Sequence, residues 1–181
     1  MTPWCLGPKT NNHSRGLLHK PDTRETAVNV KATLSPEDVA RACADAMWRD
    51  DEASRGLGMK IVDIKPGQAT LTMTVQRHMV NGQRIAHGGF IFALADSAFA
   101  FACNSHNERA VAAQGNITFI RPGKLGDVLV AAAREISRSG RSGIYDARVT
   151  VGDAVIAEFR GHSRTIGGTW LLKPETDSKQ K

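Results

Sequence analysis

The sequence contains little cysteine, and the cysteines it has form no pattern. Cys5, Cys43 and Cys103 are the three present in 181 residues. None belongs to a CxxC pair, and an odd number cannot complete a disulfide framework within one chain. The first ten residues also lack the apolar segment of a secretory signal peptide. These absences favour a protein of the reducing cytoplasm.

Long apolar runs are missing too. The most apolar stretch, residues 88–103, is 16 residues long and carries Asp96 near its middle. A bilayer-spanning helix needs about 20 residues and tolerates a central carboxylate poorly. The sequence therefore predicts no membrane span.

Aromatic residues are few, and the basic residues are dispersed. The chain has one Tyr, three Trp and six Phe, with a net charge of +6. Residues 64–165 carry twelve Lys/Arg and seven Asp/Glu, a net charge of +5, which suits an anionic ligand. Without clustered basic residues or interleaved aromatics, we expect no nucleic-acid partner.

Several chemical motifs are absent as well. There is no HExxH or cysteine cluster, so we expect neither a metal nor another cofactor. Walker A and GxGxxG sequences are missing, which argues against phosphate-loop and dinucleotide sites. The chain also lacks the GxSxG of a hydrolase nucleophile elbow.

The chain divides into a folded centre and two polar ends. Residues 1–34 are expected to be a disordered extension and residues 169–181 a polar tail, leaving 35–168 as one domain. A helix is predicted over 35–51, because Ser35 suits the N-cap and Pro36 the first helical position.

Periodicity predicts a mixed fold after this helix. Period-two alternation and turn residues indicate strands at 59–65, 68–76, 110–120, 127–137, 142–151 and 154–165. Between the second and third strands, residues 90–103 predict a helix that is apolar nearly all round. A strongly curved antiparallel sheet around a buried helix fits this order, whereas a doubly wound parallel sheet requires alternation of strands and helices. The predicted class is α+β.

Asp96 is the residue that most needs an explanation. It is the only Asp, Glu, Lys or Arg between Arg84 and Glu108, and it lies inside the most apolar helix. A buried carboxylate is costly unless it is paired or hydrogen-bonded. Taken alone, such a residue is as compatible with a structural hydrogen bond as with a reactive group.

The neighbours of Asp96 favour chemistry. Gly88 and Gly89 are expected at the start of the same helix, where backbone amides lack intrahelical acceptors. Amide donors can hold a developing oxyanion while a carboxylate drives attack, which is the pairing that acyl transfer requires. Gly88 and Asp96 are separated by roughly 12 Å of helical rise, so a bent loop or a second subunit has to bridge them. Asn81 and His87, taken alone, are typical turn residues.

These residues fall within a pattern that resembles a known family. Val80–Asn81–Gly82 and AHGGFIFALADSAFA at 86–100 closely resemble the hotdog-fold acyl-CoA thioesterases. The most similar branch is that of the phenylacetate-degradation thioesterases, PaaI. Residues 101–105, 119–127 and 159–164 fit the same branch, and the resemblance covers about 40–168.

The resemblance implies a fold, an assembly and roles. The fold would be the hotdog, a six-stranded antiparallel sheet wrapped around a central helix. Asp96 would be the general base or the nucleophile, and the Gly88 amide would polarise the thioester carbonyl. Asn81 would lie beside the substrate, with His87 and Gly89 shaping the site. The family forms dimers that pair into tetramers, so we expect a homotetramer with sites at dimer interfaces.

The implied substrate is phenylacetyl-CoA or a ring-hydroxylated relative. Asp96 must be ionised at neutral pH, and an apolar helix raises its pKa, so we expect hydrogen-bond donors to it. Some relatives place a hydroxyl on the strand after the helix; here that strand has none near its start, and Gln114 would orient water instead. Candidates for the CoA phosphates are Arg121, Lys124, Arg138, Arg141 and Arg164.

Three alternatives stay open. One is a thioesterase for medium-chain acyl groups. Another is a non-catalytic acyl-CoA-binding hotdog domain, which would need no buried carboxylate. The third is a hotdog dehydratase using His87 and Asp96 for proton transfer.

Overall fold

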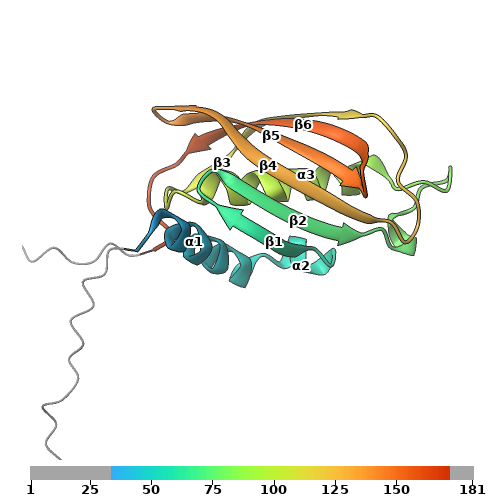
Figure 1. Cartoon of the computed structure of the whole chain (residues 1–181), viewed down its shortest axis with the longest axis horizontal. Helices are drawn as coiled ribbons and strands as arrows, with labels where there is room; N and C mark the ends of the chain where they lie inside the picture. Colours follow the sequence, from blue (N-terminus) through green and yellow to red (C-terminus); the bar gives the residue numbers. More distant parts are fainter. Residues whose placement is uncertain (1–33, 172–181) are drawn as a thin grey trace, which may run out of the picture. The chain divides into compact units, whose positions relative to one another are not determined.

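The computed structural model describes residues 34–171 and shows one sheet with a long helix packed against it (Figure 1). The expectations for residues 1–33 and 172–181 lie outside the described residues. The elements are α1 Pro36–Asp50, α2 Glu52–Gly56, β1 Lys60–Lys65, β2 Gln68–Thr74, a 3-10 turn Arg77–Met79, α3 Gly88–Asn104, β3 Ala110–Phe119, β4 Val128–Ser139, β5 Ser142–Val151 and β6 Ala154–Thr165.

The sheet has six strands in the order β1-β2-β4-β5-β6-β3, and neighbouring strands are antiparallel. This confirms the predicted architecture. The chain leaves the sheet after β2, forms α3, and returns as β3 at the far edge. There β3 pairs with β6, from Ala110 opposite Thr165 to Phe119 opposite Ala157. β1 and β3 are therefore the two edge strands of the described sheet.

α3 is the buried helix that the sequence predicts, and it begins with the two glycines expected at its start. His87 caps it, because its Nδ1 accepts a hydrogen bond of 3.0 Å from the Gly89 amide. Its buried side chains include Leu94, Ala98 and Phe99, and they pack against β2, β4 and β5. Burying apolar side chains is the main favourable term in folding, so this helix is the centre of the core.

The N-terminal helices close the β1 edge of the core. α1 has the predicted Ser35 cap, whose Oγ accepts from the Asp38 amide at 3.1 Å. α2 was not predicted, because five residues are too few to show a helical period. Its Ser54 Oγ lies 2.9 Å from the Ser97 Oγ, which ties α2 to α3.

The two ends of the sheet differ in what they carry. At one end, here called the helix-start end, the loops 77–87 and 120–127 meet at the start of α3 (Figure 1). The Ala86 amide donates to the Gly123 carbonyl at 2.8 Å there. At the opposite, hairpin end lie the β4–β5 turn, the start of β3 and the end of β6. The Thr165 amide donates to the Arg141 carbonyl at 2.9 Å at this end.

A partly buried polar cluster stabilises the hairpin end. Glu135 Oε2 accepts hydrogen bonds from the Tyr145 hydroxyl at 2.8 Å and from the His106 ring at 2.9 Å. Burial alone would raise the pKa of Glu135, but the bonds from Tyr145 and His106 outweigh burial and hold that pKa below its usual range. The cluster thereby joins β4, β5 and the segment that follows α3.

Tyr145→Phe is expected to destabilise the fold by about 1–2 kcal/mol, because a nearly fully buried hydroxyl that bonds to a carboxylate is lost. A carboxyl with a depressed folded-state pKa stabilises above its unfolded pKa, and this stability is lost as pH falls through the folded value. The variant should therefore lose less stability than wild type between neutral pH and acid. Urea unfolding at several pH values measures both effects. Equal stability of the two proteins at neutral pH would contradict the assignment.

Candidate functional site

Gly88, the first residue of α3, presents a free backbone donor. The His87 side chain accepts a hydrogen bond from the Gly89 amide. The His87 carbonyl accepts one from the Phe90 amide at 3.0 Å. The Gly88 amide has no acceptor among residues 34–171. It lies at the positive end of the helix dipole, where an anion or a polarised carbonyl oxygen is stabilised.

Phe119 explains why a glycine stands at position 88. A Cβ placed on Gly88 would lie 2.8 Å from Cζ of Phe119, closer than side chains approach in folded proteins. The ring comes from the last residue of β3 and is 51% exposed, so the core does not enclose it. The close approach of this ring to the helix start therefore depends on the missing side chain.

A cavity of about 470 Å³ opens beside Gly88. It brings together three of the predicted residues, Asn81, Gly88 and Arg121. Asn81 Oδ1 accepts from the Gln83 amide at 2.9 Å and so organises its own loop, as its turn-like context suggested. The Asn81 side-chain NH₂ donates to nothing within the described residues and can serve a ligand carbonyl. The other lining residues are Ile85, Ala86, Ile91, Phe119, Ile120 and Pro122, all apolar.

His87 and Gly89 line a separate cavity of about 440 Å³ on another side of the helix start. The His87 ring packs edge-on against Phe90, with centroids 6.1 Å apart. Because the Gly89 amide is already bonded to His87, Gly88 is the helix-start glycine with an available N–H. His87 thus positions the start of α3 and forms part of the wall of this second cavity.

Asp96 is half-buried and lies in neither cavity. Burial raises its pKa. The expected donors to Asp96 are absent from residues 34–171, so that prediction is wrong for a single chain. Helical spacing places Asp96 on the same side of α3 as Phe92, whose ring packs against Phe159 at 5.4 Å and also lies beside Gly115 of β3. The carboxylate is therefore on the side of the helix that faces the β3 edge.

The described thiols are poor candidates for a nucleophile. Burial raises the pKa of Cys103 to about 12 and also raises that of Cys43. Reactive cysteines need accessible, electropositive surroundings, which neither residue has. Between residues 34 and 171 there is no cluster of three potential metal ligands, and no helix combines the length and hydropathy of a bilayer crossing.

One chain does not gather the predicted basic residues. Arg121 and Lys124 belong to the helix-start end, whereas Arg138, Arg141 and Arg164 lie at the hairpin end. Arg138 contacts Glu108 at 3.2 Å, and Arg141 donates to the Thr165 carbonyl at 2.8 and 3.0 Å.

Gln114 is exposed in the middle of β3, opposite His162. The role of Phe119 was missed from the sequence, although it belongs to one of the stretches that carry the family resemblance.

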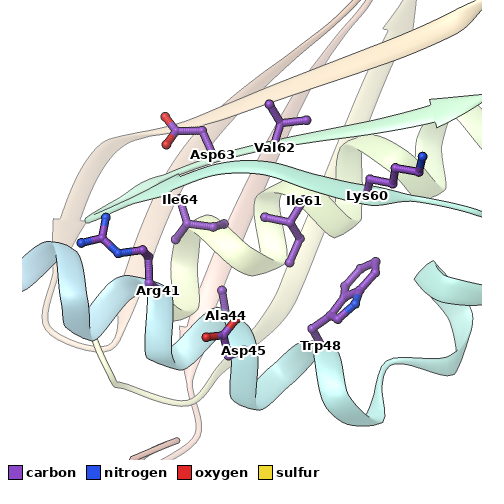
Figure 2. Close-up of a pocket in the computed structure, with 9 residues that line it drawn as sticks. All are labelled: Arg41, Ala44, Asp45, Trp48, Lys60, Ile61, Val62, Asp63 and Ile64. Atoms are coloured by element: carbon purple, nitrogen blue, oxygen red, sulfur yellow. The ribbon is translucent and has the colours of Figure 1, made fainter.

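A further cavity, of about 500 Å³, lies between α1 and β1 (Figure 2). Trp48, Ile61 and Ile64 point into the gap between the two elements. It contains none of the predicted site residues. Two of its four charged lining residues are already paired, since Arg41 bonds to Asp38 at 2.8 Å and Asp63 contacts Lys65 at 2.9 Å. Gly88 and its cavity are therefore the better candidate.

Comparison with known proteins finds a matching family model and several relatives. Residues 83–157 match the family model of the thioesterase superfamily. Acyl-coenzyme A thioesterase PaaI of Escherichia coli strain K12 is 44% identical over 127 residues, which are 70% of this chain and 91% of that protein. Human acyl-coenzyme A thioesterase 13 is 30% identical over 101 residues, 54% of this chain and 72% of that protein.

Solved structures show the same fold. The E. coli PaaI structure superposes with a TM-score of 0.73 and 42% identity, covering 75% of this chain and 99% of that one. A Streptococcus mutans protein solved with bound acetyl CoA gives a TM-score of 0.59 at 27% identity, covering 61% and 90% of the two chains.

Proposed function

Because the chain belongs to the thioesterase superfamily and is a hotdog-fold acyl-CoA thioesterase of the PaaI type, we propose that it hydrolyses phenylacetyl-CoA or ring-hydroxylated phenylacetyl-CoA to the free acid and CoA. The observation that carries the proposal is the Gly88 amide. It is left free by the His87 cap and opens into an apolar cavity beside Asn81.

The proposed chemistry follows from these donors. The Gly88 N–H and the Asn81 NH₂ hold the carbonyl oxygen as it gains charge, and one such donor contributes about 3–4 kcal/mol in other acyl-transfer sites. Asp96 drives attack, either as a base that takes a proton from water or as the nucleophile itself. The C–S bond breaks, and the thiolate of CoA leaves and is protonated.

A second copy of the chain would complete the site. Gly88 lines the cavity and Asp96 does not. From Val111 to Phe119, β3 is exposed at every position except Ile117, without the alternation of a strand that covers a core on one face. Edge strands with unpaired backbone groups readily pair with another chain. We propose that the β3 strands of two copies pair, so that each site contains Gly88 of one copy and Asp96 of the other. Two such dimers then form a tetramer in the cytoplasm.

The lining of the cavity bears on the acyl group. The Phe119 ring beside Gly88 can pack against an aryl group, an aromatic pair that adds about 0.5–1.5 kcal/mol beyond area burial. Ile85, Ile91 and Ile120 would also accept a medium-chain alkyl group, which is the second candidate. A purely binding domain is disfavoured because it gains nothing from burying Asp96 without a partner.

A thiol-release assay tests the function. Wild-type protein is given phenylacetyl-CoA, hydroxyphenylacetyl-CoA, hexanoyl-CoA and octanoyl-CoA with a thiol reagent. We expect the aryl substrates to give kcat/KM about 5–10-fold above the alkyl ones, the equivalent of one aromatic pair. Binding without thiol release from any ester would contradict hydrolysis. A dehydratase would form an alkene and release no thiol.

A further inference from the structure

We propose that the groove between α1 and the edge strand β1 binds a short extended peptide of another protein, which pairs with the outer edge of β1. The groove is the cavity of about 500 Å³ in Figure 2, and its lining divides between the two elements. The strand supplies the consecutive residues 60–64, and the helix supplies Arg41, Ala44, Asp45 and Trp48. The proposal does not depend on the proposed function, because the groove contains none of the residues assigned to hydrolysis.

The backbone edge of β1 is available for pairing. Within residues 34–171, β1 pairs with β2 on one side and with no strand on the other. An edge strand directs half of its N–H and C=O groups away from the sheet, and no loop or cap bond of the described residues uses those of residues 60–65. Because the groove touches every residue from Lys60 to Ile64, it follows this edge. A peptide that adds a strand there gains main-chain hydrogen bonds.

α1 forms the second wall of the groove. Its four lining residues are spaced i, i+3, i+4 and i+7, so they share one face of the helix. The Trp48 ring extends from this face towards β1, while Ile61 and Ile64 point from the strand towards the helix (Figure 2). Trp48 is anchored against Phe101 of α3, with ring centroids 6.0 Å apart. The three side chains in the groove form an apolar floor for one large side chain of the peptide.

Val62 is an exposed apolar residue that a paired peptide would cover. Its side chain is 62% exposed and points away from α1. It stands at a bulge of the β1–β2 ladder, where the register shifts between Ile61 and Asp63. Side chains alternate between the two faces of an extended peptide, so those that do not enter the floor lie on the face of Val62. Such a cross-strand neighbour shields Val62 from water.

Two features of β1 argue against a second copy of the same strand as the occupant. The bulge at Val62 and the lysines at both ends, Lys60 and Lys65, are devices by which edge strands avoid pairing with another sheet. Antiparallel pairing of two β1 strands would also place Lys60 of one copy opposite Lys65 of the other, and like charges in that position are destabilising. A short peptide needs no long flat edge and brings its own charges.

The charges of the groove define the peptide. Arg41 and Asp63 are paired with residues outside the groove, whereas Asp45 and Lys60 form no ion pair within residues 34–171. Arg41 lies at one end of the groove and Trp48 and Lys60 at the other (Figure 2). A peptide antiparallel to β1 has its C-terminal side at Lys60, because β1 begins there. The matching peptide therefore carries a basic residue for Asp45, then a large apolar residue for Trp48, then an acidic residue for Lys60.

Calorimetry with blocked pentapeptides tests the site on the full chain. The probe is acetyl-Lys-Thr-Leu-Thr-Glu-amide, and its control is the reversed sequence, acetyl-Glu-Thr-Leu-Thr-Lys-amide, which has the same composition. We expect the probe to bind with a Kd below about 1 mM and the reversed peptide to bind about tenfold more weakly, because attractive charge contacts become repulsive. Equal binding of the two peptides, or no binding of the probe, overturns the proposal. A Kd that rises with protein concentration would mean that a second copy occupies the groove, and it overturns the proposal too.

A charge swap in the protein localises the binding. Asp45→Lys and Lys60→Glu together change two exposed side chains, so the fold should be unaffected. This double variant is expected to prefer the reversed peptide by about tenfold, the mirror of wild type. Asp153→Lys, in the exposed turn between β5 and β6, is the matched control and should bind as wild type does. If the swap leaves the preference for the probe unchanged, the peptide binds elsewhere and the proposal is wrong.

N-methylated probes show whether the peptide pairs as a strand. In an antiparallel pair, alternate residues direct their N–H groups towards the partner strand. One probe is methylated at the amide of the central Leu and another at the amides of both Thr residues. We expect one of them to lose about tenfold or more in affinity and the other to bind nearly as the parent does. Equal effects of the two methylations, or binding of acetyl-leucinamide as tight as that of the probe, would assign the groove to a small apolar ligand and overturn the proposal.

Discussion

Asp96→Asn is expected to lower kcat by about 10²–10⁴-fold, the range in which a positioned acid or base contributes to catalysis. The fold should survive, because Asn has nearly the same shape and carries no charge to desolvate. Burial raises the pKa of Asp96, so its ionised form costs stability in the folded chain. The variant should therefore melt at the same temperature as wild type or higher. Activity near the wild-type level would show that the carboxylate takes no part in the reaction.

The pH profile of wild type extends this prediction. The reactive form is the carboxylate, so activity should fall as pH drops through the pKa of Asp96. Because burial raises that pKa, the acid limb should lie above the ordinary value of 3.8 for an Asp side chain. If the midpoint of the acid limb lay at or below pH 3.8, donors from another subunit would hydrogen-bond the carboxylate in the assembly.

Hybrid assemblies test whether the site is shared. A chain with Asp96→Asn keeps its Gly88, and a chain with Gly88→Ala keeps its Asp96. If each site takes one residue from each copy, randomly mixed chains should recover up to about a quarter of wild-type activity, since half the dimers are hybrids with one intact site of two. No recovery would place both residues of a working site on one chain.

Local sequence signals were sufficient for most of the fold. The alternation of residues 69–75 fixes which face of β2 is buried, and the Ser35-Pro36 pair marks where α1 begins. The long apolar stretch could only be a covered helix, and the order of strands around it then favoured a curved antiparallel sheet. α2 was not predicted, because this short helix is stabilised by the Asp51 cap and the Ser54 hydrogen bond and has no periodic apolar face.

The site was harder to predict, because its parts are brought together by the ends of strands. Gly88 and Asn81 share a cavity with Arg121, which follows β3 some 30 residues later along the chain. Arg138 and Arg141 are equally basic in sequence but belong to the opposite end of the sheet. The sequence shows that Asp96 is expensive to bury, but it cannot show which group, in which copy, interacts with it.

The contact between Gly88 and Phe119 gives the second large effect. Gly88→Ala keeps the backbone N–H that would hold the carbonyl oxygen, and Ala is otherwise the better helix former. The new Cβ would lie 2.8 Å from Phe119 Cζ, so the ring has to move. Because the ring is half exposed, it can rotate away from position 88 with little loss of stability. That rotation moves the ring into the cavity where the substrate would bind. We expect kcat/KM to fall about 10–100-fold, since a displacement of about 1 Å near reacting groups can cost 100-fold.

A second substitution distinguishes an effect of the Phe119 ring from an effect on the Gly88 amide. Phe119→Leu in the Gly88→Ala background removes the clashing atoms and should bring kcat/KM for an alkyl-CoA substrate back to within a few fold of Phe119→Leu alone. Gly82→Ala is the matched control, because a Cβ there meets nothing within 4 Å, and it should be neutral. If Gly88→Ala were fully active, Phe119 would not require the glycine. If the double variant stayed as impaired as Gly88→Ala, the damage would lie in the helix start itself, and the ring would not be the wall that sets the position of the thioester.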